Sequence, residues 1–278
     1  MKCFYHNDLD GRCAGAIVHK KARESGESCE FFPIDYKDEF PFESIQKDEL
    51  VYIVDFSLQK PGEFERLLEI TDNVVWIDHH KTAIERHENL QVAGIREDAI
   101  AGCVLTWHWL FPDEKMPKAV ELIGDYDVWT FKYGEDTKKF QVGMKLEDTH
   151  PQSRLWDTLL EWDARVPLII EQGTAALRYR EGHYKDLIEA ISFFTEFEGY
   201  RAVACNAALA NSMLFDSVNA GYDLMMPFYF DGSQWTVSIY TKRDDVDCSE
   251  LAKKYGGGGH KQAAGFQCKE LPFTKGAQ

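Results

Sequence analysis

The sequence predicts an α/β protein, with a parallel-sheet domain flanked by helices followed by a smaller α/β domain. In the first half, short apolar runs alternate with helical patterns. Such continuous runs are typical of central strands covered on both faces, and strand–helix alternation implies a parallel sheet wrapped by helices. After residue 200 the pattern changes to a hairpin signal. The length of 278 residues suits two modest domains, since about 100–200 residues per domain is usual.

The elements of the first half follow from their apolar spacing. The strands are expected at Lys2–Tyr5, Phe31–Tyr36, Leu50–Asp55 and Val74–Asp78. The helices are expected at Arg12–Ser25, Gly62–Thr71, Ala101–Leu110 and Pro117–Ile123. The first of these helices carries small and apolar residues at helical spacing and ends near Gly26. Proline is well placed at a helix start, which supports the last of them.

The segment Trp156–Ile191 is largely helical in pattern, with breaks expected at Pro167 and Gly173. It lacks the Gly/Ser composition of a flexible linker, so a stiff connection is expected. We therefore predict a catalytic domain at 1–150, a helical linker at 151–195 and a second domain at 196–278. The elements expected in the second domain are a strand at Arg201–Cys205, a hairpin of Asp223–Phe230 and Gln234–Thr241, a helix at Cys248–Tyr255 and a short strand near Phe266.

Composition excludes several classes of protein. The net charge is −16 and the sequence pI is about 5.0, whereas binding to long nucleic acid needs a basic stripe. A small anionic substrate held by metal ions remains compatible with this charge. No apolar run approaches the ~20 residues that span a bilayer, so no membrane association is expected. Seven cysteines without CxxC pairs and an acidic N-terminus without an apolar export segment predict a cytoplasmic protein.

Four separate clusters of acidic and histidine residues carry the expected chemistry. Three of them follow predicted strands, and the fourth follows a helix. They are His6-Asn7-Asp8-Leu9-Asp10-Gly11, Asp55, Asp78-His79-His80 and Asp125-Tyr126-Asp127. In an open parallel sheet, ligands bind at the carboxyl ends of the strands. Residues remote in sequence should therefore meet at one edge, although each Asp alone could also cap a helix.

The residue types in these clusters indicate metal ions. Crowded carboxylates and imidazoles repel or desolvate one another unless a cation neutralises them. Asp and His ligands without a thiolate suit Mn²⁺ or a similar ion, with Mg²⁺ and Co²⁺ as alternatives. The number of ligands exceeds what one ion needs. We therefore expect two divalent ions bridged by a shared carboxylate, which is an arrangement suited to hydrolysis of phosphate esters.

These motifs resemble those of the DHH phosphoesterases. Asp78-His79-His80 is similar to the motif that names the family, and His6-x-Asp8-x-Asp10-Gly11 is similar to its first motif. The resemblance implies that His6 and Asp8 hold one metal, that Asp10, His79 and Asp125 hold the other, and that Asp55 bridges them. Asp127 is the rival of Asp125. Asp78 would orient an imidazole from behind the ligands, and His80 would lie beside the scissile phosphate.

The second domain carries a glycine loop that resembles the DHHA1 signature GGGHxxAAG. The loop reads Gly257-Gly258-Gly259-His260-Lys261-Gln262-Ala263-Ala264-Gly265. The resemblance implies that the glycines, His260 and Lys261 bind the substrate. Related sequences place an Arg where Tyr240 stands here. Phosphate binding is therefore expected to shift to Lys242 or Arg243, or Tyr240 stacks on a base.

The resemblance implies hydrolysis of short oligonucleotides to mononucleotides, in the cleft between the two domains. The metal ions would activate a water molecule for attack on phosphorus. The alternatives are a phosphodiesterase acting on a cyclic nucleotide or linear dinucleotide, a pyrophosphatase of the same superfamily, which the glycine loop disfavours, and a catalytically silent nucleotide sensor. The expected partner is a short nucleotide substrate, without long nucleic acid or membrane, and a homodimer is allowed for.

Overall fold

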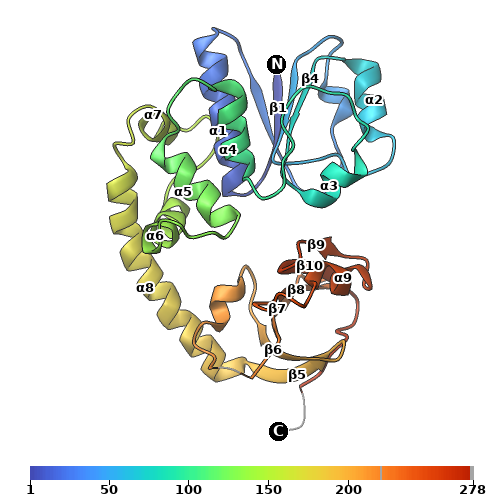
Figure 1. Ribbon diagram of the computed structural model, residues 1–278, viewed down its shortest axis with the longest axis vertical. Coiled ribbons are helices and arrows are strands. Elements are labelled where there is room, and N and C mark those ends of the chain that lie inside the picture. Colours follow the sequence, from blue (N-terminus) through green and yellow to red (C-terminus); the bar gives the residue numbers. More distant parts are fainter. Residues whose placement is uncertain (220, 276–278) are drawn as a thin grey trace. The chain divides into compact units, whose positions relative to one another are not determined.

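A computed structural model describes residues 1–219 and 221–275 (Figure 1). The chain divides into two compact units, residues 1–177 and 178–278, where the sequence suggested boundaries at 150 and 195. Helix α8 runs from the first unit into the second. The predicted α/β class is confirmed, because a parallel sheet covered by helices is followed by a second sheet.

The first unit contains four strands and most of the helices that the structure describes. Its strands are β1 (Lys2–His6), β2 (Glu30–Ile34), β3 (Val51–Val54) and β4 (Val74–Ile77). Its helices are α1 (Leu9–Glu24), α2 (Glu63–Ile70), α3 (Lys81–Arg86), α4 (Gly102–Leu110), α5 (Lys118–Asp127), α6 (Glu135–Gly143), α7 (Leu155–Leu160) and the first part of α8 (Val166–Ile191).

The four strands of this unit form an all-parallel sheet in the order β2-β1-β3-β4. Alternate residues of each strand enter different cores: Cys3 and Tyr5 pack with α1, α4 and α5, whereas Phe4 packs with α2. In Figure 1, α1 and α4 cover one face of the sheet and α2 the other. The strand order therefore reverses between β1 and β3, and the crevice at such a switch point is the usual ligand site of an open α/β sheet.

The second unit contains a mixed sheet of six strands in the order β5-β6-β7-β8-β10-β9. Only the β6–β7 pair is parallel among these described strands. Its elements are β5 (Phe193–Phe197), β6 (Tyr200–Asn206), β7 (Leu224–Phe230), β8 (Trp235–Tyr240), α9 (Cys248–Lys253), β9 (Gly258–Gly259) and β10 (Ala263–Cys268). One face packs on α9 and the other on the end of α8, so the sheet is buried on both sides.

Of the two breaks predicted in the connecting segment, the one at Gly173 is wrong, whereas Pro167 does follow an interruption between α7, which ends at Leu160, and α8, which begins at Val166. Helix α8 is continuous from Val166 to Ile191. Pro167 stands in its first turn, where the missing N–H has no helical partner to lose. Gly173 allows a close contact instead of a break, because an added Cβ would lie 1.8 Å from the carbonyl oxygen of Lys139 in α6. Helices α3 and α6 and strand β5 were not predicted.

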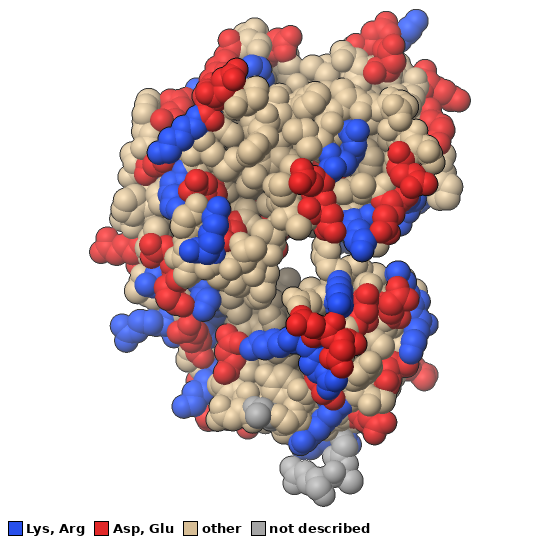
Figure 2. All heavy atoms as spheres, viewed as in Figure 1, with Lys and Arg blue, Asp and Glu red and all other residues tan. Residues whose placement is uncertain are grey.

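The sequence led us to expect cysteines without disulfides and no membrane-spanning segment. All seven cysteines lie in the described part of the chain, and none forms a disulfide. Among the helices of residues 1–219 and 221–275, none combines the length and apolarity required to span a membrane. On the face viewed in Figure 2, basic and acidic side chains are interspersed over the surface.

Candidate metal centre

The carboxyl ends of three neighbouring strands deliver the first residues of the site. His6 is the last residue of β1, Asp55 follows β3 directly, and Asp78 follows β4. The register pairs β1 with β3 and β3 with β4 in parallel, so these ends meet at one edge of the sheet. The fold therefore brings together these residues, which are remote in sequence.

One group of potential metal ligands consists of His6, Asp8 and Asp55, whose ligand atoms lie within 4.8 Å of one another. His6 Nδ1 is 2.9 Å from Asp8 Oδ2 and 3.7 Å from Asp55 Oδ2. Asp8 also caps helix α1, because its Oδ1 accepts a hydrogen bond from the backbone N–H of Gly11 at 2.9 Å. Asp8 can therefore serve both as helix cap and as ligand, through different oxygens.

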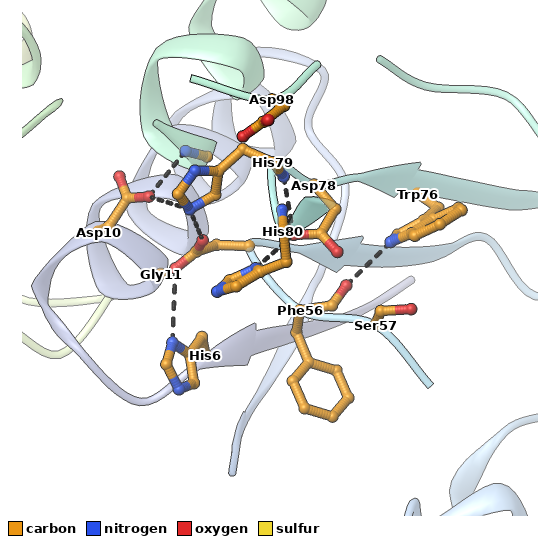
Figure 3. A network of polar contacts seen from close by, with 12 residues as sticks. His6, Asp10, Gly11, Phe56, Ser57, Trp76, Asp78, His79, His80 and Asp98 are labelled. Atoms are coloured by element: carbon orange, nitrogen blue, oxygen red, sulfur yellow. Dashed lines mark hydrogen bonds and ion pairs between the residues drawn. The ribbon is translucent and has the colours of Figure 1, made fainter. Parts of the chain in front are cut away.

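A second group consists of Asp10, His79 and Asp127. His79 Nε2 is 3.9 Å from Asp10 Oδ2 and 3.4 Å from Asp127 Oδ2. The same nitrogen lies 3.1 Å from Asp55 Oδ1. Figure 3 shows the imidazole of His79 directed toward Asp10, with His6 and His80 nearby. Asp55 thus stands between the two groups, with one oxygen on the side of His6 and the other on the side of His79.

Asp55 is held in an unusual state for a carboxylate. Its side chain is buried, and neither oxygen accepts a geometrically satisfactory hydrogen bond from the described residues. Its backbone is left-handed, with φ of 54°, which is uncommon for a residue other than glycine. Buried, unsatisfied carboxylate oxygens and backbone strain both cost free energy and recur at functional sites. Cations bound by the two groups would satisfy both oxygens.

Helix α4 fixes Asp10, a contribution that the sequence analysis missed. The backbone N–H groups of Gly102 and Cys103 donate to the two carboxylate oxygens of Asp10 at 2.7 and 2.9 Å. These amides belong to the first turn of α4, where unpaired N–H groups favour an anion. Gly102 is required by space, since an added Cβ would lie 2.6 Å from the Cβ of Asp55. The only sequence signal was a glycine at an expected helix start.

Burial and the charges within the cluster shift the pKa values of its histidines and carboxylates. Burial disfavours charge on His6, but the carboxylates of Asp55 and Asp8 outweigh burial and raise the pKa of His6 to about 11. Burial and Asp55 together raise the pKa of Asp10 to about 7, and burial followed by Asp10 raises that of Asp127 well above its usual value. The metal-free cluster therefore holds protons where a divalent cation would place positive charge.

The structure corrects the predicted ligand Asp125, because Asp127 takes its place in the cluster. Asp125 Oδ1 accepts hydrogen bonds from Thr130 Oγ1 at 2.5 Å and from the backbone N–H of Lys132 at 2.8 Å. Its other oxygen accepts from the N–H of Tyr133 at 3.3 Å and from the hydroxyl of Thr137. Both oxygens are thus committed to the segment that follows α5, and Asp125 is a structural anchor of that segment.

Asp78 and His80 form a pair beside the two groups. His80 Nδ1 lies 2.7 Å from Asp78 Oδ1, and the same oxygen accepts from the backbone N–H of His79 at 2.8 Å. Burial disfavours the charged imidazole, but Asp78 outweighs it and raises the pKa of His80. The predicted orienting role of Asp78 thus has a geometric basis, and the imidazole that Asp78 contacts is that of His80.

Tyr36 is a second residue that the sequence analysis did not assign to the site. Its ring lies 5.3 Å from that of His6 and 5.8 Å from that of His80, between ring centroids, and it stacks on Phe56 at 5.3 Å. The side chain is nevertheless 44% exposed. Burial and the carboxylate of Asp78 raise the pKa of Tyr36, so its phenol stays protonated at neutral pH. Its position beyond the end of β2 gave no motif from which this contact could be predicted.

The glycine loop of the second unit is shaped by its own backbone contacts. Gly258 and Gly259 form β9, which pairs with Ala264 and Gly265 of β10. An added Cβ would lie 2.1 Å from the Gly265 carbonyl oxygen at Gly257, and 2.6 Å from the Ala263 carbonyl oxygen at Gly259. Two of the three glycines are thus required by packing alone, and the predicted contact of the loop with substrate stays a prediction.

The polar side chains predicted around this loop differ in their exposure and in the ion pairs that they form. His260 and Lys261 are exposed. Lys242 is also exposed and lies 3.7 Å from Asp216 through its Nζ. Arg243 donates to Asp223 at 2.5 Å and to both oxygens of Asp245 at 2.9 and 2.6 Å. With its guanidinium engaged by two carboxylates, Arg243 is less suited to a phosphate than Lys242.

Two known proteins are similar to this chain in sequence. An oligoribonuclease of Bacillus subtilis, NrnB, is 26% identical over 94% of this chain and 71% of its own length. An uncharacterized protein of Acanthamoeba polyphaga mimivirus is 25% identical over 81% of this chain, and the chain spans 55% of that protein. No protein-family model matches the sequence.

Solved structures of DHH proteins share the fold. The DHH domain of a member of the s1p family of ribosomal proteins has a TM-score of 0.67, at 13% identity over 95% of this chain and 81% of that one. The DHH-fold RecJ of Thermus thermophilus, solved in complex with Mn²⁺, has a TM-score of 0.51, at 16% identity over 95% of this chain and 49% of that one. The fold, the motifs and the similarity to NrnB agree. The chain shares the DHH fold, and its motifs resemble those of the DHH/DHHA1 phosphoesterases.

Metal binding at this site is expected to release protons. His6 and His79, with pKa values raised to about 11 and about 10, are charged in the metal-free protein at neutral pH. Metal ligation requires neutral imidazoles, so Mn²⁺ binding at pH 7.5 should release at least about two protons per chain. Calorimetry in two buffers with different ionisation enthalpies measures this number. Binding without proton release would contradict the assignment of both imidazoles.

The raised pKa values of His6 and His79 also predict how the stability of the metal-free protein changes with pH. Both pKa values are raised above the unfolded value of about 6.5. The stability that the charged imidazoles contribute is therefore full below that value and is lost as the pH rises through about 10 to 11. Urea unfolding of chelator-treated protein between pH 7 and pH 10 should show this decline. A pH-independent stability over that range would contradict it.

Proposed function

We propose that the protein is a metal-dependent phosphodiesterase that hydrolyses short oligonucleotides to mononucleotides. The observation that carries the proposal is the position of Asp55 between two ligand groups, His6–Asp8 on one side and Asp10–His79–Asp127 on the other. Two cations sharing a carboxylate suit displacement at phosphorus, because both the attacking and the leaving oxygen need stabilisation.

The residues present fit two divalent ions, for which Mn²⁺ is the best candidate. The donors are carboxylate oxygens and imidazole nitrogens without thiolates, which favours Mn²⁺ or Mg²⁺ over structural zinc. The buried oxygens of Asp55 and Asp127 Oδ2 lack hydrogen bonds from described residues, so each retains the capacity to bind a cation. When bound, such ions supply an activated water nucleophile and offset the charge on the phosphoryl oxygens.

The chain's own residues position the reacting groups. The α4 amides fix the Asp10 carboxylate, so Asp10 does not have to reorganise when it binds a cation. Asp78 accepts a hydrogen bond from His80 Nδ1, which fixes the orientation of that ring. Asp78 raises the pKa of His80 against the effect of burial, which suits the His80 imidazole to donating a proton to the leaving oxygen.

The glycine loop and Lys242 are proposed to bind the distal part of the substrate. The backbone at Gly258, where an added Cβ would meet open space, can be approached closely by a phosphate. His260 and Lys261 add side-chain donors. With a net charge of −16, the protein gains little general attraction for polyanions, so few local contacts must hold the substrate. That condition favours short substrates over long ones.

Two similar proteins bear on the choice of substrate. NrnB of Bacillus subtilis is an oligoribonuclease, which supports oligonucleotides. The pGpG-specific phosphodiesterase PggH of Vibrio cholerae shares the fold, with a TM-score of 0.52 at 15% identity over 96% of this chain and 93% of that one. Hydrolysis of one particular linear dinucleotide is therefore the second candidate.

A substrate panel separates these functions. The Mn²⁺-loaded protein is incubated with dinucleotides of different sequence, with oligonucleotides of three to about twenty nucleotides, with cyclic dinucleotides, with 3′,5′-cyclic AMP and with pyrophosphate. Products are resolved by chromatography. We expect mononucleotides from all dinucleotides and declining rates with length. Turnover of a single dinucleotide would favour the second candidate, and turnover of pyrophosphate alone would overturn the proposal.

A further inference from the structure

The segment that follows helix α5 presents a strained, partly exposed aromatic cluster beside the metal ligands. Trp129 and Phe131 have left-handed backbones, with φ of 59° and 49°. Bulky residues rarely adopt this conformation, which costs of the order of 1–3 kcal/mol per residue and persists only when neighbouring structure enforces it. Such strain concentrates at ligand-binding segments.

Three rings of this segment support one another. The Trp129 ring packs edge-to-face on Tyr126, with centroids 5.0 Å apart, and on Phe131, with centroids 4.8 Å apart. Tyr126 and Phe131 also meet edge-to-face at 5.8 Å. Although it is clamped by two rings, the Trp129 side chain remains 42% exposed. An indole that is held firmly and still open to solvent is suited to stacking on a flat ligand.

Hydrogen bonds to Asp125 hold the segment in this conformation. Its carboxylate accepts four hydrogen bonds from residues that follow the helix, and its backbone carbonyl accepts one from the N–H of Thr130 at 3.1 Å. The charged anchor and its hydrogen bonds offset the backbone strain at Trp129.

The cluster is close to the candidate metal centre through the chain itself. Asp127, whose Oδ2 lies 3.4 Å from His79 Nε2, is two residues before Trp129. Two residues span at most roughly 7 Å between Cα atoms. The Cα of the exposed Trp129 therefore lies within about 7 Å of the Cα of a candidate metal ligand.

We propose that Trp129 is a substrate-binding residue that stacks on a nucleobase of the substrate. This proposal rests on the proposed phosphodiesterase function and adds what the enzyme recognises beside the phosphate. Base–indole stacking tolerates any sequence, because every base has a π-face. It gives an acidic protein affinity for nucleotides that does not depend on positive charge. Tyr126 and Phe131 hold the indole, and Asp125 holds the segment.

The test compares a dinucleotide with its abasic counterpart, which keeps the sugar–phosphate backbone. Trp129→Ala should lower kcat/KM for the dinucleotide by about fivefold to a hundredfold, mostly through KM. The abasic substrate should lose much less. Trp129→Phe should restore most of the loss, since a ring is retained. Trp162→Ala, which removes another exposed tryptophan of the first unit, is the matched control and should leave both substrates unaffected.

A binding measurement makes the test independent of hydrolysis. Wild-type protein loaded with Mn²⁺ should bind a nucleoside 5′-monophosphate more tightly than ribose 5-phosphate, and Trp129→Ala should remove this difference. Equal losses on the dinucleotide and the abasic substrate, or an unchanged binding preference in Trp129→Ala, would overturn the proposal. If the wild type cleaved no dinucleotide, the proposed function would fail, and the binding preference would still decide the role of Trp129.

Discussion

Replacing Asp55 by Asn should abolish hydrolysis while leaving the protein folded. Asn keeps the shape of the side chain but removes the charge that stands between His6 and His79. Asp55 belongs to the group of His6 and Asp8, and its other oxygen lies 3.1 Å from His79 of the second group, so Mn²⁺ content should fall at both groups. Loss of one electrostatic contact to a transition state costs about a hundredfold to a thousandfold, and loss of a shared ligand should exceed that range.

The control for this variant is Asp72→Asn, which changes an exposed carboxylate of the same unit. It should retain wild-type turnover and metal content. Circular dichroism of the metal-free proteins establishes whether Asp55→Asn folds. A folded Asp55→Asn protein with wild-type turnover and two bound Mn²⁺ ions would show that Asp55 does not bridge the metals.

Asp127→Asn should reduce metal binding and turnover, whereas Asp125→Asn should mainly reduce stability. Asp127→Asn removes a ligand oxygen of the group that contains Asp10 and His79, so Mn²⁺ binding and turnover should fall, by at least about a hundredfold for turnover. Asp125→Asn removes a charged acceptor of four hydrogen bonds. Its main effect should be destabilisation, of about 2–4 kcal/mol, because hydrogen bonds to a charged group contribute about 1.5–3 kcal/mol each and are not additive.

The pH dependence of unfolding identifies the Asp125 effect. The pKa of Asp125 is lowered in the folded protein, so its stabilisation is present above the unfolded value of about 3.9 and is lost as the pH falls through the folded pKa. The stability difference between wild type and Asp125→Asn should be largest near neutral pH and shrink below about pH 4. If Asp125→Asn lost bound metal but kept its stability, Asp125 would be the metal ligand, and its assignment as a structural anchor would be wrong.

The confusion between Asp125 and Asp127 has a simple geometric origin. Both lie in α5, and residues two apart on a helix point to nearly opposite faces. Sequence spacing placed an acidic pair near the other ligands but did not specify which helix face meets His79. That orientation depends on the packing of α5 against α1, α4 and α6, which involves residues far apart in the sequence.

Other parts of the site were predictable because strand ends carry them. His6, Asp55 and Asp78 follow apolar runs, and a parallel sheet brings such ends to one edge. In contrast, Tyr36 and the amides of Gly102 and Cys103 enter through tertiary contacts. A tyrosine after β2 and a glycine at the start of α4 carry no local pattern that distinguishes a site residue from an ordinary loop or helix residue. The continuity of α8 through Gly173 was missed because this glycine serves a close helix–helix contact, which the sequence alone does not show.

Turnover as a function of bound Mn²⁺ tests the central claim most directly. Metal-free protein is prepared with a chelator, Mn²⁺ is added stepwise, and bound metal and dinucleotide hydrolysis are measured in the same samples. A two-metal site should give no turnover without metal and a steep rise as the second ion binds, because both ligand groups must be filled around Asp55. Full turnover in metal-free protein, or saturation at one bound ion per chain, would contradict a two-metal site.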